Sequence, residues 1–179
     1  SCFPKDALAL VRTAQDHGAP MRIVETVVSI NETRKLRMVD KIVDGCGASV
    51  ADKTIAVLGL TFKPNTDDIR DSASLDVIGR LQEMVAVVRV FDPQGMAEGR
   101  KSIDDVTWCS DAYDAADGAD ALAILTEWNE FRALDFTRLG KLLRAKVLVD
   151  LRNIYDPAEI ARAGFDYIGV GRAPVRRDS

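Results

Sequence analysis

The chain begins with two stretches in which apolar side chains recur at helical spacing. The first covers residues 4–16, has a proline in its first turn and is followed by Gly18, which predicts a short helix. The second covers residues 21–45 without an internal glycine or proline, and at ~1.5 Å per residue it reaches roughly 37 Å. Its apolar stripe is interrupted at Asn31, where a polar side chain can set the register between packed helices or face a site.

From residue 54 onward, strand-like and helix-like patterns alternate. The continuous apolar run 54–60 is typical of a central parallel strand. Further strands are predicted at 87–91, 121–125, 147–149 and 167–170, and helices at 74–84, 111–116, 136–143 and 157–163. The alternation predicts the α/β class, with a Rossmann-like doubly wound parallel sheet and functional residues at the carboxyl ends of its strands.

This pattern also predicts the domain organisation. We expect a helical arm over residues 1–50, a Rossmann-like domain over residues 51–172 and a frayed tail over residues 173–179. The length of 179 residues fits one domain with an appendage. The chain does not begin with methionine, and we expect that the beginning of a longer protein is missing.

Composition and charge exclude several classes of protein. With 24 Lys and Arg against 28 Asp and Glu, the net charge of −4 argues against a nucleic-acid or anionic membrane surface. No apolar run approaches the ~18 residues that span a bilayer, and the first residues lack the apolar core of a signal peptide, which predicts a cytoplasmic protein. Three widely spaced cysteines and one histidine fit neither a disulfide framework nor a zinc site, so no metal ligands are predicted.

The loop after the first predicted strand is long and charged. Residues 60–70 span eleven positions, whereas an ordinary connection to the next helix needs about 2 to 6. The loop contains no G-x-G-x-x-G turn, so it does not hold a pyrophosphate in the usual dinucleotide manner. Its cations, Lys63 and Arg70, predict an anionic ligand. The alternative is that Arg70 pairs with Asp67, Asp68 or Asp71 and only maintains the shape of the loop.

Cys2 stands at the start of the first predicted helix, next to Lys5. A helix N-terminus and a lysine both favour the thiolate, which is the form that a nucleophile needs. Asp6, one turn along, can accept a proton from water that attacks a thioester. The alternative is a small buried apolar side chain, which we expect for Cys46 and Cys109.

Arg152 follows the predicted strand 147–149, again at a carboxyl end. An arginine at this place can bind a phosphate or a carboxylate with two parallel hydrogen bonds. It can equally pair with Asp150 or Asp156.

Four segments together resemble the UDP-glucose/GDP-mannose dehydrogenase family, with the UDP-glucose dehydrogenases as the most similar branch. They are Cys-Phe-Pro-Lys-Asp at 2–6, Gly-Leu-Thr-Phe-Lys-Pro-Asn-Thr-Asp-Asp-Ile-Arg-Asp-Ser at 59–72, Leu-Thr-Glu-Trp at 125–128 and Asp-Leu-Arg-Asn at 150–153. The resemblance implies oxidation of the C6 alcohol of UDP-glucose to a carboxylate, with two NAD+ consumed and a thiohemiacetal and a thioester formed on cysteine. On this resemblance Cys2 is the nucleophile and Asp6 handles the water.

The same resemblance assigns the binding residues. Phe62 and Lys63 contact the nucleotide sugar, Arg152 binds the substrate and Arg70 reaches the NAD. The long helix from Met21 matches the family's central helix, which implies a homodimer. Its interface residues would be Val24, Val28 and Val39.

The family's NAD-binding turn, its catalytic lysine and an arginine donated across the dimer all precede the cysteine, and these 179 residues do not contain them. We therefore expect a C-terminal part of such an enzyme, inactive alone, with NAD bound mainly by the preceding part. Within the family, a GDP-mannose or UDP-N-acetyl-hexosamine dehydrogenase is an alternative. Outside it, the alternative is a nucleotide-binding or dimerisation module without catalysis.

Overall fold

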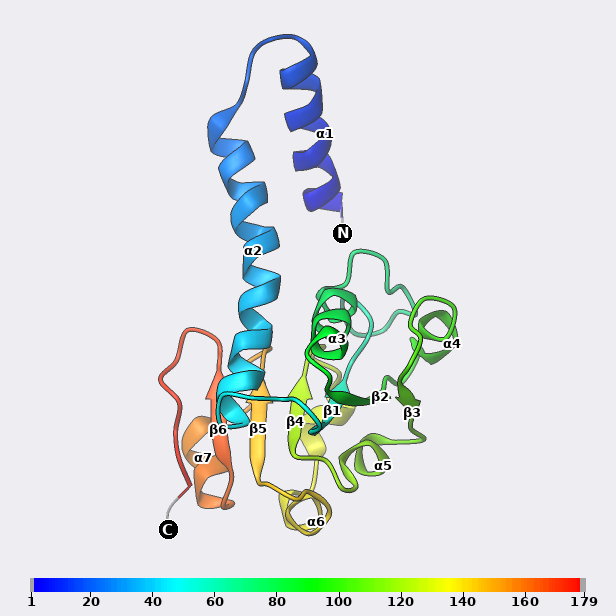
Figure 1. The fold of residues 1–179 in the computed structure, drawn as a ribbon, viewed down its shortest axis with the longest axis vertical. Helices are drawn as coiled ribbons and strands as arrows, with labels where there is room; N and C mark the ends of the chain where they lie inside the picture. Colours follow the sequence, from blue (N-terminus) through cyan, green and yellow to red (C-terminus); the bar gives the residue numbers. More distant parts are fainter. Residues whose placement is uncertain (1, 178–179) are drawn as a thin grey trace.

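A computed structural model describes the backbone of residues 2–177 and the side chains of residues 4–177. Its centre is a six-stranded parallel sheet with the strand order β3-β2-β1-β4-β5-β6 (Figure 1). The strands are β1 Thr54–Leu58, β2 Val87–Phe91, β3 Thr107–Trp108, β4 Ala121–Ile124, β5 Val147–Asp150 and β6 Asp166–Gly169. The order reverses between β1 and β4, as in doubly wound nucleotide-binding folds. The predicted fold class is confirmed.

The helices alternate with these strands. They are α1 Cys2–Asp16, α2 Arg22–Gly45, α3 Ala73–Glu83, α4 Met96–Gly99, α5 Ala112–Ala116, the 3-10 helix η1 Asn129–Ala133, α6 Phe136–Leu142 and α7 Pro157–Arg162. Polar side chains begin four of them, because a side-chain oxygen can accept hydrogen bonds from the free N–H groups of a first turn. These residues are Ser72, Asp111, Asp135 and Asp156.

Both faces of the sheet are covered, and alternate residues of each central strand serve opposite faces. In β1, Ile55 and Val57 pack in one cluster with α2 and α3. Ala56 and Leu58 pack in a second cluster with α5, α6 and α7. Because successive side chains of a strand point to opposite faces, a strand buried on both sides has a continuous apolar sequence.

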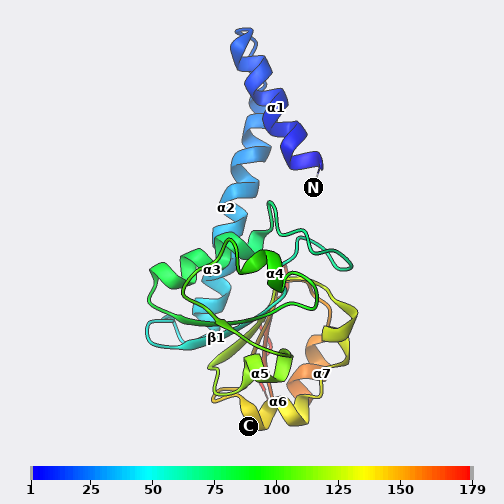
Figure 2. The same cartoon turned by 90° about the vertical axis from the view of Figure 1, so that its right-hand side faces the viewer.

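The helical arm projects from this domain. Figures 1 and 2 show α2 rising away from the sheet and α1 returning along it, so that the first turn of α1 lies above the loop of residues 60–72. The chain reverses at Gly18, whose φ of +64° favours glycine. Where the arm is folded back on itself, Gln15 Nε2 donates to Glu25 Oε1 at 3.1 Å.

The inner end of α2 belongs to the domain core. Ile42 and Cys46 are buried against the sheet, and a Cβ at Gly45 would lie 2.8 Å from Cδ1 of Ile168, so a larger residue there would have to displace that side chain. Val39 is 2% exposed in the same cluster. The prediction that Val39 lies in a subunit interface is therefore wrong, because its side chain is already covered within the chain.

Some elements differ from the sequence-based predictions. The two-residue strand β3, the single-turn α4 and the 3-10 helix η1 were not predicted, because segments this short carry little periodicity. Val175 pairs with Tyr167 in an antiparallel bridge, and the backbone N–H of Arg177 donates to Asp166 Oδ1 at 2.9 Å. The predicted frayed tail is therefore wrong for residues 175–177. Among the described residues, no helix combines the length and apolarity that crossing a membrane requires.

Candidate functional site

The ends of β1 and β4 approach each other where the strand order reverses. Gly59, directly after β1, has a φ of +99°, and a Cβ there would lie 2.5 Å from Cβ of Thr126. Thr126 Oγ1 donates to the carbonyl oxygen of Thr61 at 2.6 Å. The Leu-Thr-Glu-Trp segment is thus joined to the loop after β1, at the place where doubly wound sheets bind ligands.

The carboxylate of Asp92, at the end of β2, organises the first turn of this loop. It is 1% exposed and accepts six hydrogen bonds. Oδ2 accepts from the backbone N–H of Leu60 and of Thr61, from Thr61 Oγ1 and from Trp128 Nε1, and Oδ1 accepts from the backbone N–H of Gln94 and of Gly95.

The bonds to Asp92 involve the backbone N–H groups that a dinucleotide would need in the first turn after β1. A dinucleotide-binding turn offers backbone N–H groups to a pyrophosphate. Here the N–H groups of Leu60 and Thr61 are already bound to Asp92, at 2.7 and 3.2 Å. These two N–H groups are therefore not free to bind a pyrophosphate, and the turn has no G-x-G-x-x-G sequence.

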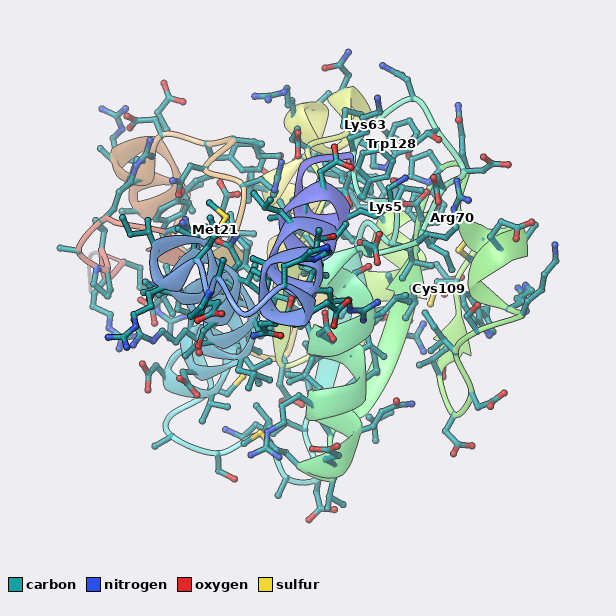
Figure 3. All side chains as sticks on the ribbon, turned by 90° about the horizontal axis from the view of Figure 1, so that it is seen from above. Lys5, Met21, Lys63, Arg70, Cys109 and Trp128 are labelled. Carbon is teal, nitrogen blue, oxygen red and sulfur yellow. The ribbon has the colours of Figure 1, made fainter. Side chains whose placement is uncertain are left out.

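The loop of residues 60–72 presents Lys63 at the surface. Its Nζ lies 5.2 Å from the centroid of the half-buried Phe62 ring, and the two side chains form a cation–π interaction. Ser74 Oγ fixes the base of the loop by donating to the carbonyl oxygen of Leu60 at 2.6 Å. In Figure 3, seen along the arm, Lys5 of α1 lies over the same side of the domain as Lys63 and Arg70.

Arg70 is bound to Asp68. Its Nε and Nη2 donate to the two carboxylate oxygens of Asp68, both at 2.8 Å, although the arginine side chain is 85% exposed. These hydrogen bonds hold the pKa of Asp68 below its usual range and raise the pKa of Arg70. The pairing with a loop aspartate, one of the two sequence-based alternatives, is present, and the role of Arg70 in NAD binding stays a prediction.

Arg152 pairs with Glu127, not with Asp150 or Asp156. Its Nε donates to Glu127 Oε2, so the two partners named in the sequence-based alternative are wrong. Asp150 instead accepts from the backbone N–H groups of Arg152 and Tyr155, and Asp156 begins α7. Burial raises the pKa of Glu127, but the hydrogen bond and charge of Arg152 outweigh it, and the net pKa lies below the usual value.

Arg152 lines a cavity of ≈ 250 Å³ between α2 and the carboxyl ends of the strands. The cavity also contains Leu125 after β4, Val170 after β6, and Asn31, Arg34 and Lys35 of α2. Lys35 Nζ lies 3.2 Å from Glu32 and 3.0 Å from Asp76 of α3. Burial lowers the pKa of Lys35, but these two carboxylates outweigh it and the net pKa is raised.

Sequence reasoning missed Arg34 and Lys35. The signal was present at Asn31, the polar break in the apolar stripe, because residues three and four positions later lie on the same side of a helix. Three cations, Arg34, Lys35 and Arg152, thus face one cavity that only the packing of α2 on the strand ends creates.

The structure does not bring all the predicted site residues together. Arg152 lines the cavity, whereas Phe62 and Lys63 lie on the neighbouring loop outside it. Asp6 is exposed in α1, the helix that returns toward that loop. The side chain of Cys2 lies outside the described residues. Cys46 and Cys109 are buried and unpaired, as predicted.

Residues 56–157 match the model of the UDP-glucose/GDP-mannose dehydrogenase family, UDP binding domain. The chain belongs to this family. The family's UDP-binding domain thus covers the sheet from β1 to the start of α7, including the loop with Lys63, the turn with Glu127 and the turn with Arg152.

Individual relatives extend the similarity to the arm. The UDP-glucose 6-dehydrogenase of Rhizobium meliloti (strain 1021) is 54% identical over 172 residues, which are 96% of this chain and 39% of the relative. The structure of a UDP-glucose dehydrogenase from Pyrobaculum islandicum matches with a TM-score of 0.82 at 36% identity, over 97% of this chain and 38% of that one. The UDP-D-ManNAc dehydrogenase of Pyrococcus horikoshii matches with a TM-score of 0.77 at 27% identity, over 96% and 38%. The chain spans about two fifths of the length of these relatives.

Proposed function

We propose that this chain is the UDP-binding, C-terminal part of an NAD-dependent UDP-glucose 6-dehydrogenase that oxidises the C6 alcohol of UDP-glucose to a carboxylate. The observation that supports this most directly is the cavity at the strand ends in which Arg152, Arg34 and Lys35 meet. Three cations around one hollow suit the diphosphate of a nucleotide sugar, because arginine and lysine bind phosphate oxygens strongly. The relative from Rhizobium meliloti carries the same activity in its name.

In this proposal the site residues that the structure describes have binding or proton-transfer roles. Arg152 and Arg34 bind the phosphates, and Lys63 with Phe62 covers the sugar nucleotide from the neighbouring loop. NAD, which would accept one hydride in each of the two oxidation steps, would be held mainly by residues outside these 179, since the N–H groups of Leu60 and Thr61 in the first turn of this domain are already bound to Asp92. Arg70, on the exposed edge of the loop after β1, would contact only the periphery of the NAD.

The nucleophile assignment extends this proposal to the arm. The Cys2 thiolate forms a C–S bond with the C6 aldehyde to give the oxyanion of a thiohemiacetal, and departure of a hydride from C6 to NAD+ would give a thioester. Water then forms the new C–O bond, the C–S bond breaks, the thiolate leaves, and Asp6 accepts the proton of the water. The return of α1 over the loop of residues 60–72 supports this assignment, because it places the first turn of α1 above the strand ends.

Homodimerisation and a cytoplasmic location remain part of the proposal. Seven of the nine exposed large apolar side chains of the described residues lie on the arm: Leu8, Leu10, Met21, Ile23, Val27, Ile30 and Leu36. Such a surface is typical of a protein interface. Val24 and Val28, the predicted interface residues, are half-buried, so Ile23, Val27 and Ile30 are the better candidates.

A second candidate function is the oxidation of a UDP-N-acetyl-hexosamine. The structural similarity to the UDP-D-ManNAc dehydrogenase of Pyrococcus horikoshii supports it. Both candidate substrates contain the same diphosphate. The cations of the cavity therefore support binding of a nucleotide diphosphate more strongly than binding of one particular sugar.

Calorimetry of this chain with UDP tests the proposal. We expect measurable UDP binding, and binding at least about tenfold weaker, or ~1.4 kcal/mol, for Arg152→Ala. Arg162→Ala, an exposed arginine at the end of α7, is the matched control and should bind as the wild type does. A wild-type chain that does not bind UDP, an unaffected Arg152→Ala variant, or tight binding of NAD+ would overturn the proposal.

A further inference from the structure

Glu127 has no role in the function proposed above, yet it is the acidic partner of the arginine that lines the cavity. We propose that Glu127 is a positioning residue: it holds Nε of Arg152 so that the two terminal nitrogens of the guanidinium face the anion in the cavity. This inference rests on the proposed binding of a nucleotide diphosphate and adds the group that prepares its principal cation.

Glu127 is itself held in place from both sides. Thr126 before it donates to the carbonyl oxygen of Thr61 at 2.6 Å, and the indole N–H of Trp128 after it donates to Asp92 at 3.1 Å. The preceding N–H, of Leu125, donates to the carbonyl oxygen of Leu58 at 2.8 Å. The segment on both sides of Glu127 is therefore tied to the end of β1 and its loop and to Asp92 after β2. An ion pair at a surface usually loses its gain to side-chain freedom, but here one partner is anchored in advance.

Arg152 is anchored at its backbone and at Nε only. Its backbone N–H donates to Asp150 Oδ1 at 3.1 Å, which fixes the turn after β5. Its two terminal nitrogens donate no hydrogen bond to any residue that the structure describes, and the side chain is 40% exposed at the cavity. Two parallel N–H groups on one planar head form the fork that matches a phosphate.

Holding Nε in advance reduces the cost of binding. A free arginine side chain must lose rotamer freedom when it binds a ligand, and fixing it beforehand removes that cost. Lys35, across the same cavity, is held in a similar way by Glu32 and Asp76. Two of the three cations of the cavity therefore have carboxylates that orient them. The pairing of Arg152 with Glu127 thus has a counterpart across the cavity and is not an isolated ion pair at the surface.

The opposite effect of Glu127 is also physically possible, and the two can be separated. If its charge mainly neutralised Arg152, its removal would strengthen anion binding. If it positions Arg152, its removal weakens anion binding, and only while Arg152 is present.

The test is calorimetry of this chain with UDP for Glu127→Ala, Glu127→Gln, Arg152→Ala and the double variant Glu127→Ala with Arg152→Ala. We expect Glu127→Ala to weaken UDP binding about tenfold. Glu127→Gln should lose less, because its amide oxygen still accepts the hydrogen bond from Nε. The double variant should bind no more weakly than Arg152→Ala, since a positioning residue has no effect without its partner. Glu130→Ala, an exposed glutamate three residues away that forms no ion pair among the described residues, is the control and should bind as the wild type does.

A second measurement does not depend on the ligand. In the free chain, the Nε–H signal of Arg152 in a nitrogen–proton spectrum should be slow to exchange, and it should be lost in Glu127→Ala. Unchanged or stronger UDP binding by Glu127→Ala, additive losses in the double variant, or an unprotected Nε–H in the wild type would each overturn the inference. If the wild type binds no UDP at all, the proposed function fails instead, and the inference about a diphosphate fails with it.

Discussion

The nucleotide-fold domain and the outer half of the helical arm differ in how their apolar side chains are covered. In the domain, side chains such as Leu122 are 0% exposed and lie between the sheet and its helices. On the arm, Ile23 is 82% exposed, and Leu8, Val27 and Ile30 are exposed as well. The domain buries its own core, whereas the arm presents an apolar surface that only another surface can cover.

The polar groups show the same difference. In the domain, buried carboxylates have several partners, as Asp92 does, and no buried side-chain nitrogen or oxygen of the described residues lacks a hydrogen bond. On α2, Arg34 and Lys35 line a cavity, and Lys35 is paired with Glu32 and Asp76 at its side. The arm is therefore attached to the domain by its inner end and supplies cations to the site along its middle.

The largest expected effect is in the domain core. Leu122→Ala should lower the free energy of unfolding by about 2 to 5 kcal/mol, because it leaves a cavity in a fully buried strand. Leu8→Ala on the arm, at 42% exposure, is the matched change and should stay within about 0.5 kcal/mol. Urea unfolding measures both, and equal losses would contradict the difference between the two regions.

An intermediate effect is expected at the inner end of the arm. Burial raises the pKa of the Cys46 thiol to about 11, against the attraction of Lys53. Because the folded protein keeps the proton longer than the unfolded chain, this contribution is complete below pH ~9 and is lost as the pH rises toward 11, by about 2 to 3 kcal/mol in total.

Urea unfolding at pH 8, 9 and 10 should therefore show a steeper loss of stability for the wild type than for Cys46→Ala. Staying at or below pH 10 limits the contribution of Tyr155, whose pKa burial raises to about 12. Parallel pH profiles would show that Cys46 is not in the buried environment that the structure gives it.

The smallest effect on stability is expected on the outer face of the arm. Ile23→Ser should change the free energy of unfolding by less than about 0.5 kcal/mol, because the side chain is already in water. It should weaken self-association of the chain in sedimentation experiments, whereas Asp40→Ser, an exposed control on α2, should not. Undiminished association in Ile23→Ser would mean that this face does not form the interface.

The sequence by itself determined most of the secondary structure and the fold class. The continuous apolar run of β1 and the uninterrupted helical pattern of α2 are local signals, and both elements form nearly where they were predicted. The loop of residues 60–70 was identified from its length and charge, and Arg152 from its place after a strand. Short elements such as β3 escaped, because two residues show no period.

Only the tertiary structure decided which side chains face each other. Val39 and Ile23 both belong to the apolar residues of α2, but contact with the sheet covers Val39 and leaves Ile23 exposed. Glu127 and Arg152 are 25 residues apart and meet because β4 and β5 are neighbours. Periodicity reports which side of an element is apolar, whereas the partner across an ion pair or a cavity depends on how distant segments pack.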